Sequence, residues 1–149
     1  ERIRYALNNH DFYTVQQSIV DLEGENEGLF ENRTFMREEE GDTPATEFML
    51  AAERNDLGST IDRHVMPQLM VAIAGTGDKH IISLSNNSIL DFSFPHWFER
   101  MLKETEVVGS QIVLQISGIV AERLAERFLA QAKIIADSIL HLDMPGEAT

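Results

Sequence analysis

Apolar residues recur three and four positions apart in several stretches of the chain, which is the period of a helix packed on a core. In Ala45–Arg54, for example, Phe48, Met49 and Ala52 fall on one face. A Thr-Pro pair precedes this stretch, and proline is tolerated at a helix start because the first N–H groups there have no partner. The same period predicts helices over 2–8, Ala45–Arg54, about Thr60–Ile73, about Phe94–Lys103 and about Val120–Leu142.

Other stretches are rich in β-branched and aromatic residues, which favours strands. The first two, Phe12–Leu22 and Leu29–Met36, flank a polar, glycine-containing turn and predict a hairpin. The next two, Ile81–Leu84 and Gln111–Ile116, alternate with predicted helices. Such alternation is typical of parallel strands joined by helical crossovers. The order α-ββ-αα-β-α-β-α therefore predicts an α/β fold in a single domain over residues 1–149.

The acidity of the chain limits its partners. Its 149 residues carry 25 Asp and Glu against 12 Lys and Arg, a formal net charge of −13. We therefore expect no nucleic-acid partner and no binding to an anionic membrane surface, and no apolar run approaches the roughly 18 residues of a membrane span. The absence of cysteine excludes disulfides and fits the reducing cytoplasm, where we expect the protein to work. The chain starts at Glu1 without Met, which suggests a part of a longer protein.

Three local patterns suggest chemistry, but each has a simpler explanation. Gly75 and Gly77 follow a helix, whereas phosphate-binding loops lie between a strand and a helix. The acidic run Glu38–Asp42 offers carboxylates for a metal, but consecutive side chains diverge, so we interpret it as a solvated loop. The five histidines have no metal-ligand spacing, and no Gly-x-Ser-x-Gly turn is present. These residues therefore predict no metal, cofactor or hydrolase site.

A resemblance to a known family rests on four segments in order. The first has the family pattern aromatic-x-x-x-x-Gln-Pro-Ile-Val-Asp-Leu, with Ser18 in place of the proline, and the second combines Pro-x-x-x-Phe with an Ala-Glu and a later Ile-Asp-Arg. The third resembles Val-Asn-Leu-Ser-x-x-Ser-Leu and the fourth Leu-Glu-Ile-Thr-Glu. Together they resemble the EAL domain, the family of cyclic di-GMP phosphodiesterases. The segments are Phe12–Leu22, Pro44–Met66, Ile82–Ile89 and Leu114–Gly118.

The resemblance implies a modified TIM barrel whose first strand runs antiparallel to the others. The chain is shorter than the family's domain, so we expect a partial barrel, truncated after about the fourth strand and its helix. Such a barrel has open strand edges, which are prone to pairing with another chain. We therefore expect a protein partner or a homo-oligomer to cover an open edge, unless the chain itself is truncated.

The family's metal-binding positions are changed in this chain. The signature Glu-Ala-Leu-Leu-Arg falls on Arg33–Arg37, so Arg33 stands in place of a metal-binding Glu, and a guanidinium repels a metal. Glu31 lies on the same strand face two residues away, and a shifted register would restore a carboxylate there. The changed positions predict the loss of metal-dependent phosphodiesterase activity and no catalytic residues. They are Arg33, Ser83, Gln115 and Gly118.

Several ligand-binding positions of the family are retained. The resemblance implies that Gln17 contacts the nucleotide, Phe35 packs beneath it, Arg37 holds a phosphate and Asp62 faces a guanine, with Arg33 as a second phosphate partner. The pattern is similar to the FimX-like subgroup, which binds cyclic di-GMP without cleaving it. We interpret the chain as a non-catalytic cyclic di-GMP receptor in bacterial signalling, such as type IV pilus motility or biofilm formation. An interaction module that has lost the nucleotide, and an active phosphodiesterase, are the alternatives.

Overall fold

The computed structural model describes residues 2–19, 28–117 and 139–143. Its strands form one sheet in the order β1-β2-β4-β5-β6, with the two-residue β3 paired to β2. β1 is antiparallel to β2, whereas β2, β4, β5 and β6 are parallel to one another. The α/β class and the antiparallel first strand are thus confirmed. The strands are β1 (Phe12–Ser18), β2 (Leu29–Met36), β3 (Thr43–Pro44), β4 (Lys79–Leu84), β5 (Ile112–Ser117) and β6 (Ile139–Asp143).

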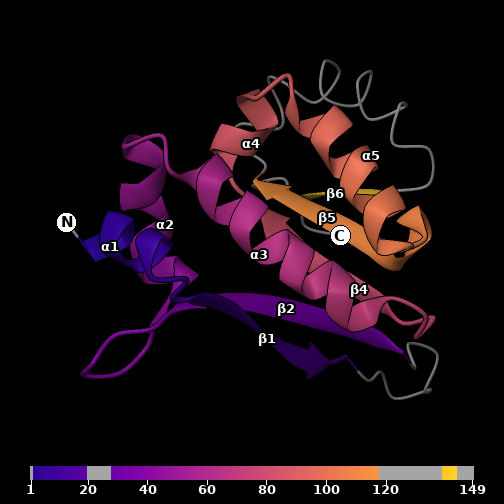
Figure 1. Cartoon of the computed structure of the whole chain (residues 1–149), viewed down its shortest axis with the longest axis horizontal. Helices are drawn as coiled ribbons and strands as arrows, with labels where there is room; N and C mark the ends of the chain where they lie inside the picture. Colours follow the sequence, from indigo (N-terminus) through magenta and orange to yellow (C-terminus); the bar gives the residue numbers. More distant parts are fainter. Residues whose placement is uncertain (1, 20–27, 118–138, 144–149) are drawn as a thin grey trace.

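The helices follow the predicted order closely. The segments predicted over 2–8 and 45–54 form helices with those bounds, and the next helix begins two residues earlier than predicted, at Gly58. In Figure 1, α3 and α5 lie over the same face of the sheet. The helices are α1 (Arg2–Asn8), α2 (Ala45–Arg54), α3 (Gly58–Ile73), α4 (Asn86–Leu90) and α5 (Phe94–Thr105), with a 3-10 turn at Gly109–Gln111.

The predicted closing helix is wrong at its C-terminal end. Residues 118–138 lie outside the described residues, but 139–142 belong to β6, which pairs in parallel with β5. β6 is therefore a strand beyond the four that the sequence predicted. A short apolar segment fits either a helix or a strand by its pattern alone, and here the free edge of β5 supplies the backbone partners.

Alternation along the strands divides the sheet into two faces. On one face, Met36, Ile82 and Leu114 are almost fully buried against the helices. From α3, Ile61, Val65, Met66 and Leu69 pack into the same core. Side chains at the intervening positions lie on the opposite face, which we call the open face. The open face includes Tyr13, Val15, Gln17, Glu31, Arg33, Phe35, Ile81, Ser83, Val113 and Gln115.

Candidate functional site on the open face

Strand register brings most of the predicted site residues together on the open face. Gln17 of β1 lies opposite Glu31 of β2, and Tyr13 lies opposite Phe35. Further across the sheet, Ser83 of β4 is the neighbour of Gln115 of β5. The open face therefore combines amides, a hydroxyl, aromatic rings and a charged pair on one surface.

Arg33 and Glu31 form an ion pair on this surface. Arg33 Nε lies 3.5 Å from Glu31 Oε1, with the two side chains 63% and 42% exposed. Both candidate positions for the family's metal-binding carboxylate therefore lie on the open face, but the carboxylate of Glu31 already has a cationic partner. Within the described residues, no three His, Asp or Glu side chains converge as a metal site would require.

Arg37 lies where β2 ends, among aromatic residues. The rings of Tyr13 and Phe35 stack with centroids 5.7 Å apart, and the Arg37 guanidinium carbon lies 4.6 Å from the centre of the Tyr13 ring. The backbone N–H of Arg37 donates to the carbonyl of Asp11 at 2.8 Å. The guanidinium thus has a cation–π contact with Tyr13, the ring that stacks on the predicted packing residue Phe35.

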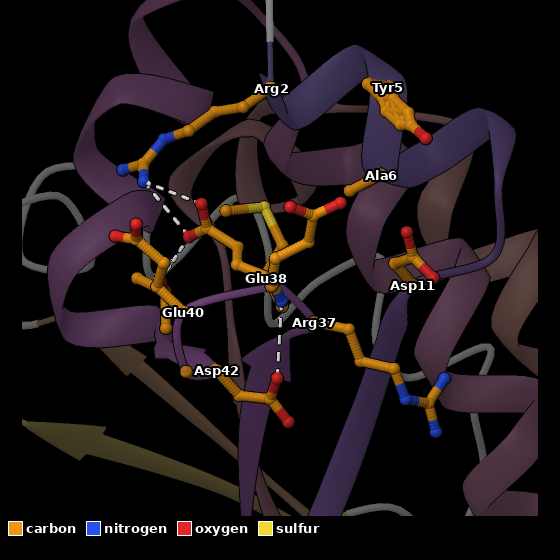
Figure 2. Close-up of a pocket in the computed structure, with 12 residues that line it drawn as sticks. Arg2, Tyr5, Ala6, Asp11, Arg37, Glu38, Glu40 and Asp42 are labelled. Carbon is orange, nitrogen blue, oxygen red and sulfur yellow. Dashed lines mark hydrogen bonds and ion pairs between the residues drawn. The ribbon is translucent and has the colours of Figure 1, made fainter.

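A surface pocket of about 810 Å³ lies next to Arg37, between α1 and the loop that joins β2 to β3. Its rim is mainly acidic, with Glu38, Glu39, Glu40 and Asp42, and Arg2 pairs with Glu38 at 3.0 Å. Figure 2 shows the Arg37 side chain extending away from the loop carboxylates. The guanidinium therefore lies on the sheet side of this loop rather than being neutralised within it.

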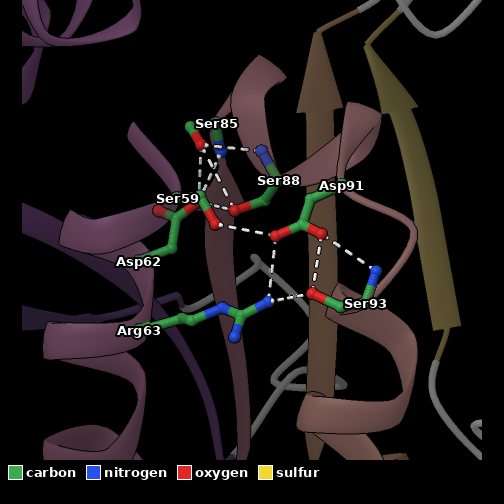
Figure 3. A network of polar contacts seen from close by, with 7 residues as sticks. All are labelled: Ser59, Asp62, Arg63, Ser85, Ser88, Asp91 and Ser93. Atoms are coloured by element: carbon green, nitrogen blue, oxygen red, sulfur yellow. Dashed lines mark hydrogen bonds and ion pairs between the residues drawn. The ribbon is translucent and has the colours of Figure 1, made fainter. Parts of the chain in front are cut away.

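Asp62 lies elsewhere, inside the helix-covered side of the molecule. Its Oδ2 accepts hydrogen bonds from the Ser85 N–H at 3.0 Å and from the hydroxyls of Ser85 and Ser88, each at 2.7 Å. Only 3% of Asp62 is exposed, and this burial raises the pKa of its carboxyl to about 6, although the serine hydrogen bonds act in the opposite direction. The carboxylate to which the resemblance assigns guanine recognition is therefore hydrogen-bonded within the protein (Figure 3), and its role in binding stays a prediction.

A second set of polar contacts, nearer the surface, involves Arg63, the residue after Asp62. Arg63 Nη2 donates to Asp91 Oδ2 at 2.9 Å and to the Ser93 hydroxyl at 2.8 Å, and its guanidinium carbon lies 5.2 Å from the centre of the Trp97 ring. Burial acts to raise the pKa of Asp91, but the Ser93 hydrogen bonds and the Arg63 charge outweigh it and hold the pKa below its usual range. Figure 3 shows these side chains joining α3 to the turns at both ends of α4. These contacts hold α3 against α4 and the start of α5.

The structure brings together two residues that the sequence analysis did not assign to a site. Tyr13 and Asp42 contact each other at the end of β2, and neither was a predicted site residue. Alternation places Tyr13 on the same strand face as Gln17, so its position was open to prediction, whereas the contact with Asp42 depends on how the loop folds. Gly118 lies outside the described residues.

Comparisons with known proteins agree with this fold. The family model described as EAL domain matches residues 1–137. The FimX EAL domain from Pseudomonas aeruginosa, bound to c-di-GMP, is 23% identical with a TM-score of 0.85, and the match covers 98% of this chain and 62% of that one. The PaMucR phosphodiesterase in its c-di-GMP complex is 17% identical with a TM-score of 0.85, covering 99% of this chain and 63% of that one.

A third similar structure is that of a considerably longer protein. Vibrio cholerae LapD, an S helix-GGDEF-EAL protein bound to c-di-GMP, is 17% identical with a TM-score of 0.81, and the match covers 97% of this chain and 36% of that chain. The chain therefore spans less than two thirds of each of these proteins, as expected for a partial barrel. No curated protein matches it. In the described part of the chain, no helix has the length and apolarity needed to cross a bilayer.

Proposed function

Because the chain belongs to the EAL domain family, we propose that it is a cyclic di-GMP-binding signalling module that does not hydrolyse its ligand. The carrying observation is the Arg33–Glu31 ion pair in the middle of the open face. It places a guanidinium where the family resemblance expects a metal-binding carboxylate. Hard divalent cations prefer clustered oxygen ligands and are repelled by a guanidinium, so this pair is unsuited to holding a metal.

The open face and the strand ends supply groups that suit a cyclic dinucleotide. Arg37 and Arg33 offer planar guanidinium groups for phosphate oxygens. Gln17 offers an amide that both donates and accepts, and Phe35 offers an aromatic surface next to Tyr13. Because the whole chain carries a net charge of −13, these arginines have to supply the local attraction for an anionic ligand.

The remaining family metal positions support the same interpretation. Ser83 and Gln115 are neighbours in register and present a hydroxyl and a neutral amide. Neither supplies the fixed negative charge that holds catalytic metals, and metal-assisted attack on a phosphodiester depends on such ions. We therefore propose a receptor that acts in bacterial cytoplasmic signalling, of the kind that controls pilus motility or biofilm formation.

Titration calorimetry of the full chain with cyclic di-GMP, in the presence of EDTA, tests this proposal. We expect binding without added metal, and Arg37→Ala to weaken it by about ten- to a hundredfold, the range for a hydrogen bond to a charged group. Arg100→Ala, an exposed arginine on α5, is the matched control and should bind like the wild type. Release of linear pGpG in the presence of Mg²⁺ or Mn²⁺ would contradict the non-hydrolytic assignment.

A second candidate is an interaction module that has lost the nucleotide. The observation that favours it is the engagement of Arg33 by Glu31, which partly neutralises a cation that the ligand would need. This candidate predicts no calorimetric heat and no thermal stabilisation by cyclic di-GMP. A bound ligand at 100 times its dissociation constant would instead add about 2.7 kcal/mol to the free energy of unfolding.

A further inference from the structure

A side-chain hydrogen bond joins the loop after β2 to β1. The Tyr13 hydroxyl of β1 donates a hydrogen bond to Oδ2 of Asp42. The other carboxylate oxygen of Asp42 accepts the backbone N–H of Glu38 at 3.2 Å. Since Glu38 directly follows Arg37, Asp42 ties the backbone after Arg37 to the Tyr13 ring. We call this pair the Tyr13–Asp42 clamp.

The same ring also contacts the Arg37 guanidinium, at 4.6 Å from its centre. On its N-terminal side, Arg37 is fixed by the hydrogen bond from its own N–H to the Asp11 carbonyl. Backbone bonds before and after Arg37, together with the Tyr13 ring, therefore restrict an otherwise exposed and flexible side chain. Phe35 stacks on Tyr13 and restricts the ring in turn.

Asp42 lies close enough to Arg37 for the guanidinium charge to add to the Tyr13 hydrogen bond in lowering the pKa of the Asp42 carboxyl, but it forms no ion pair with it. Asp42 directs its carboxylate to the Tyr13 hydroxyl and the Glu38 N–H, and within the described residues Arg37 has no carboxylate at salt-bridge distance. The hydrogen bond to Asp42 raises the pKa of Tyr13 and lowers the pKa of Asp42, so the donor and the acceptor both keep their states at neutral pH. The guanidinium N–H groups are left for another anion.

We infer that Tyr13 and Asp42 are positioning residues that hold the Arg37 guanidinium in the orientation needed for a phosphate group. This inference rests on the proposed function, because the phosphate is that of the cyclic dinucleotide. A guanidinium binds phosphate through a planar fork, so its orientation matters as well as its charge. Ordering a rotamer-rich side chain before the ligand arrives removes part of the entropic cost of binding.

Titration of cyclic di-GMP into matched variants of the full chain tests the clamp. Tyr13→Leu removes the ring and should weaken binding about three- to tenfold, the cost of ordering one such side chain. Tyr13→Phe keeps the ring but loses the hydrogen bond to Asp42, so it should weaken binding less than Tyr13→Leu but measurably, and wild-type affinity for Tyr13→Phe would overturn the role of Asp42. Tyr5→Leu, which removes the other tyrosine, 59% exposed on α1, should leave affinity unchanged.

A double-mutant cycle shows whether Tyr13 acts through Arg37. In the Arg37→Ala background, Tyr13→Leu should have no further effect, whereas in the Arg33→Ala background it should weaken binding by its usual factor. Equal losses in both backgrounds would overturn the inference, because they would indicate a general structural role.

A spectroscopic titration tests the clamp without any ligand. In a Tyr5→Phe background, the ultraviolet absorbance of the phenolate reports Tyr13 alone. Asp42→Asn should lower the pKa of Tyr13 toward the ordinary tyrosine value near 10. An unchanged pKa of Tyr13 would overturn the clamp. If the wild type binds no cyclic di-GMP, the proposed function fails with the inference. If the wild type binds cyclic di-GMP and Tyr13→Leu binds it equally well, the inference fails while the proposed function stands.

Discussion

The two faces of the sheet differ although they share the same strands. Ile82 and its neighbour Ile81 are the same residue type, yet Ile82 is 2% exposed against the helices and Ile81 is only partly buried on the open face. On the open face Val15 is 46% exposed. The helix-covered face carries the apolar core, whereas the open face carries the groups suited to a ligand. Under the proposed function, the hydrophobic core and the ligand site lie on opposite sides of a single sheet.

Polar groups show the same division. On the helix-covered face, Asn32 is buried and its amide nitrogen contacts His80 Nδ1 at 3.0 Å and the Ile81 carbonyl at 3.1 Å, although its Oδ1 has no hydrogen-bond partner among the described residues. On the open face, Arg33 and Glu31 meet at 3.5 Å in contact with water. Buried polar groups need fixed partners because an unmade bond is costly, whereas exposed groups exchange partners with solvent. The open face can therefore change its chemistry without changing the fold.

Shortening one isoleucine on each face gives the largest expected contrast. Ile82→Ala leaves a cavity in the core and should lower the free energy of unfolding by about 2–5 kcal/mol. Ile81→Ala, one residue away, should cost less than half as much, because its side chain has fewer neighbours to lose. Urea unfolding of both variants measures the difference, and equal losses would mean that the open face is covered in solution.

Asp62 provides a pH test of the helix-covered side. Its pKa is raised to about 6 in the folded protein, against about 3.9 when unfolded, so between these values the folded state binds more protons. Its contribution to stability should therefore fall as pH rises from about 4 to 6, by about 3 kcal/mol in total. Asp62→Asn lacks this titration, while both proteins share Glu53, Arg63 and Asp91. Thermal or urea unfolding of both at several pH values isolates the Asp62 term, and parallel pH profiles would contradict it.

Local pattern accounted for the parts of the fold that local contacts determine. The bounds of β2 and α2 match those predicted from periodicity, because each has a strong alternating or helical pattern over its whole length. The short helix α4 was not predicted. Its N-cap is Ser85, whose hydroxyl accepts the Ser88 N–H while donating to Asp62, 23 positions earlier in the chain. A five-residue helix needs such distant partners to form.

The candidate site divides in the same way. The strand period alone assigns Arg33 and Phe35 to one face, and the pairing register of β1 with β2 adds Gln17 to it. The burial of Asp62 is different, since it depends on serines from another element and on the close approach of α3 to α4 at Gly58, where a Cβ would lie 2.8 Å from the Ser85 Cβ. The Tyr13–Asp42 clamp likewise depends on a loop that returns to β1. These long-range contacts leave no periodic trace in the sequence.

The smallest expected change in stability is at the centre of the open face. Arg33→Gln breaks the ion pair with Glu31, but both side chains are substantially exposed, so the free energy of unfolding should change by less than about 0.5 kcal/mol. Lys103→Gln, which breaks the exposed Lys103–Glu99 pair of α5 at 3.1 Å, is the matched control and should be equally mild. The two variants should differ in binding: Arg33→Gln should weaken cyclic di-GMP several-fold and reduce its salt dependence, while Lys103→Gln should not. A loss of stability well above 1 kcal/mol for Arg33→Gln alone would show that the open face also supports the fold, and the separation of the two faces would no longer hold.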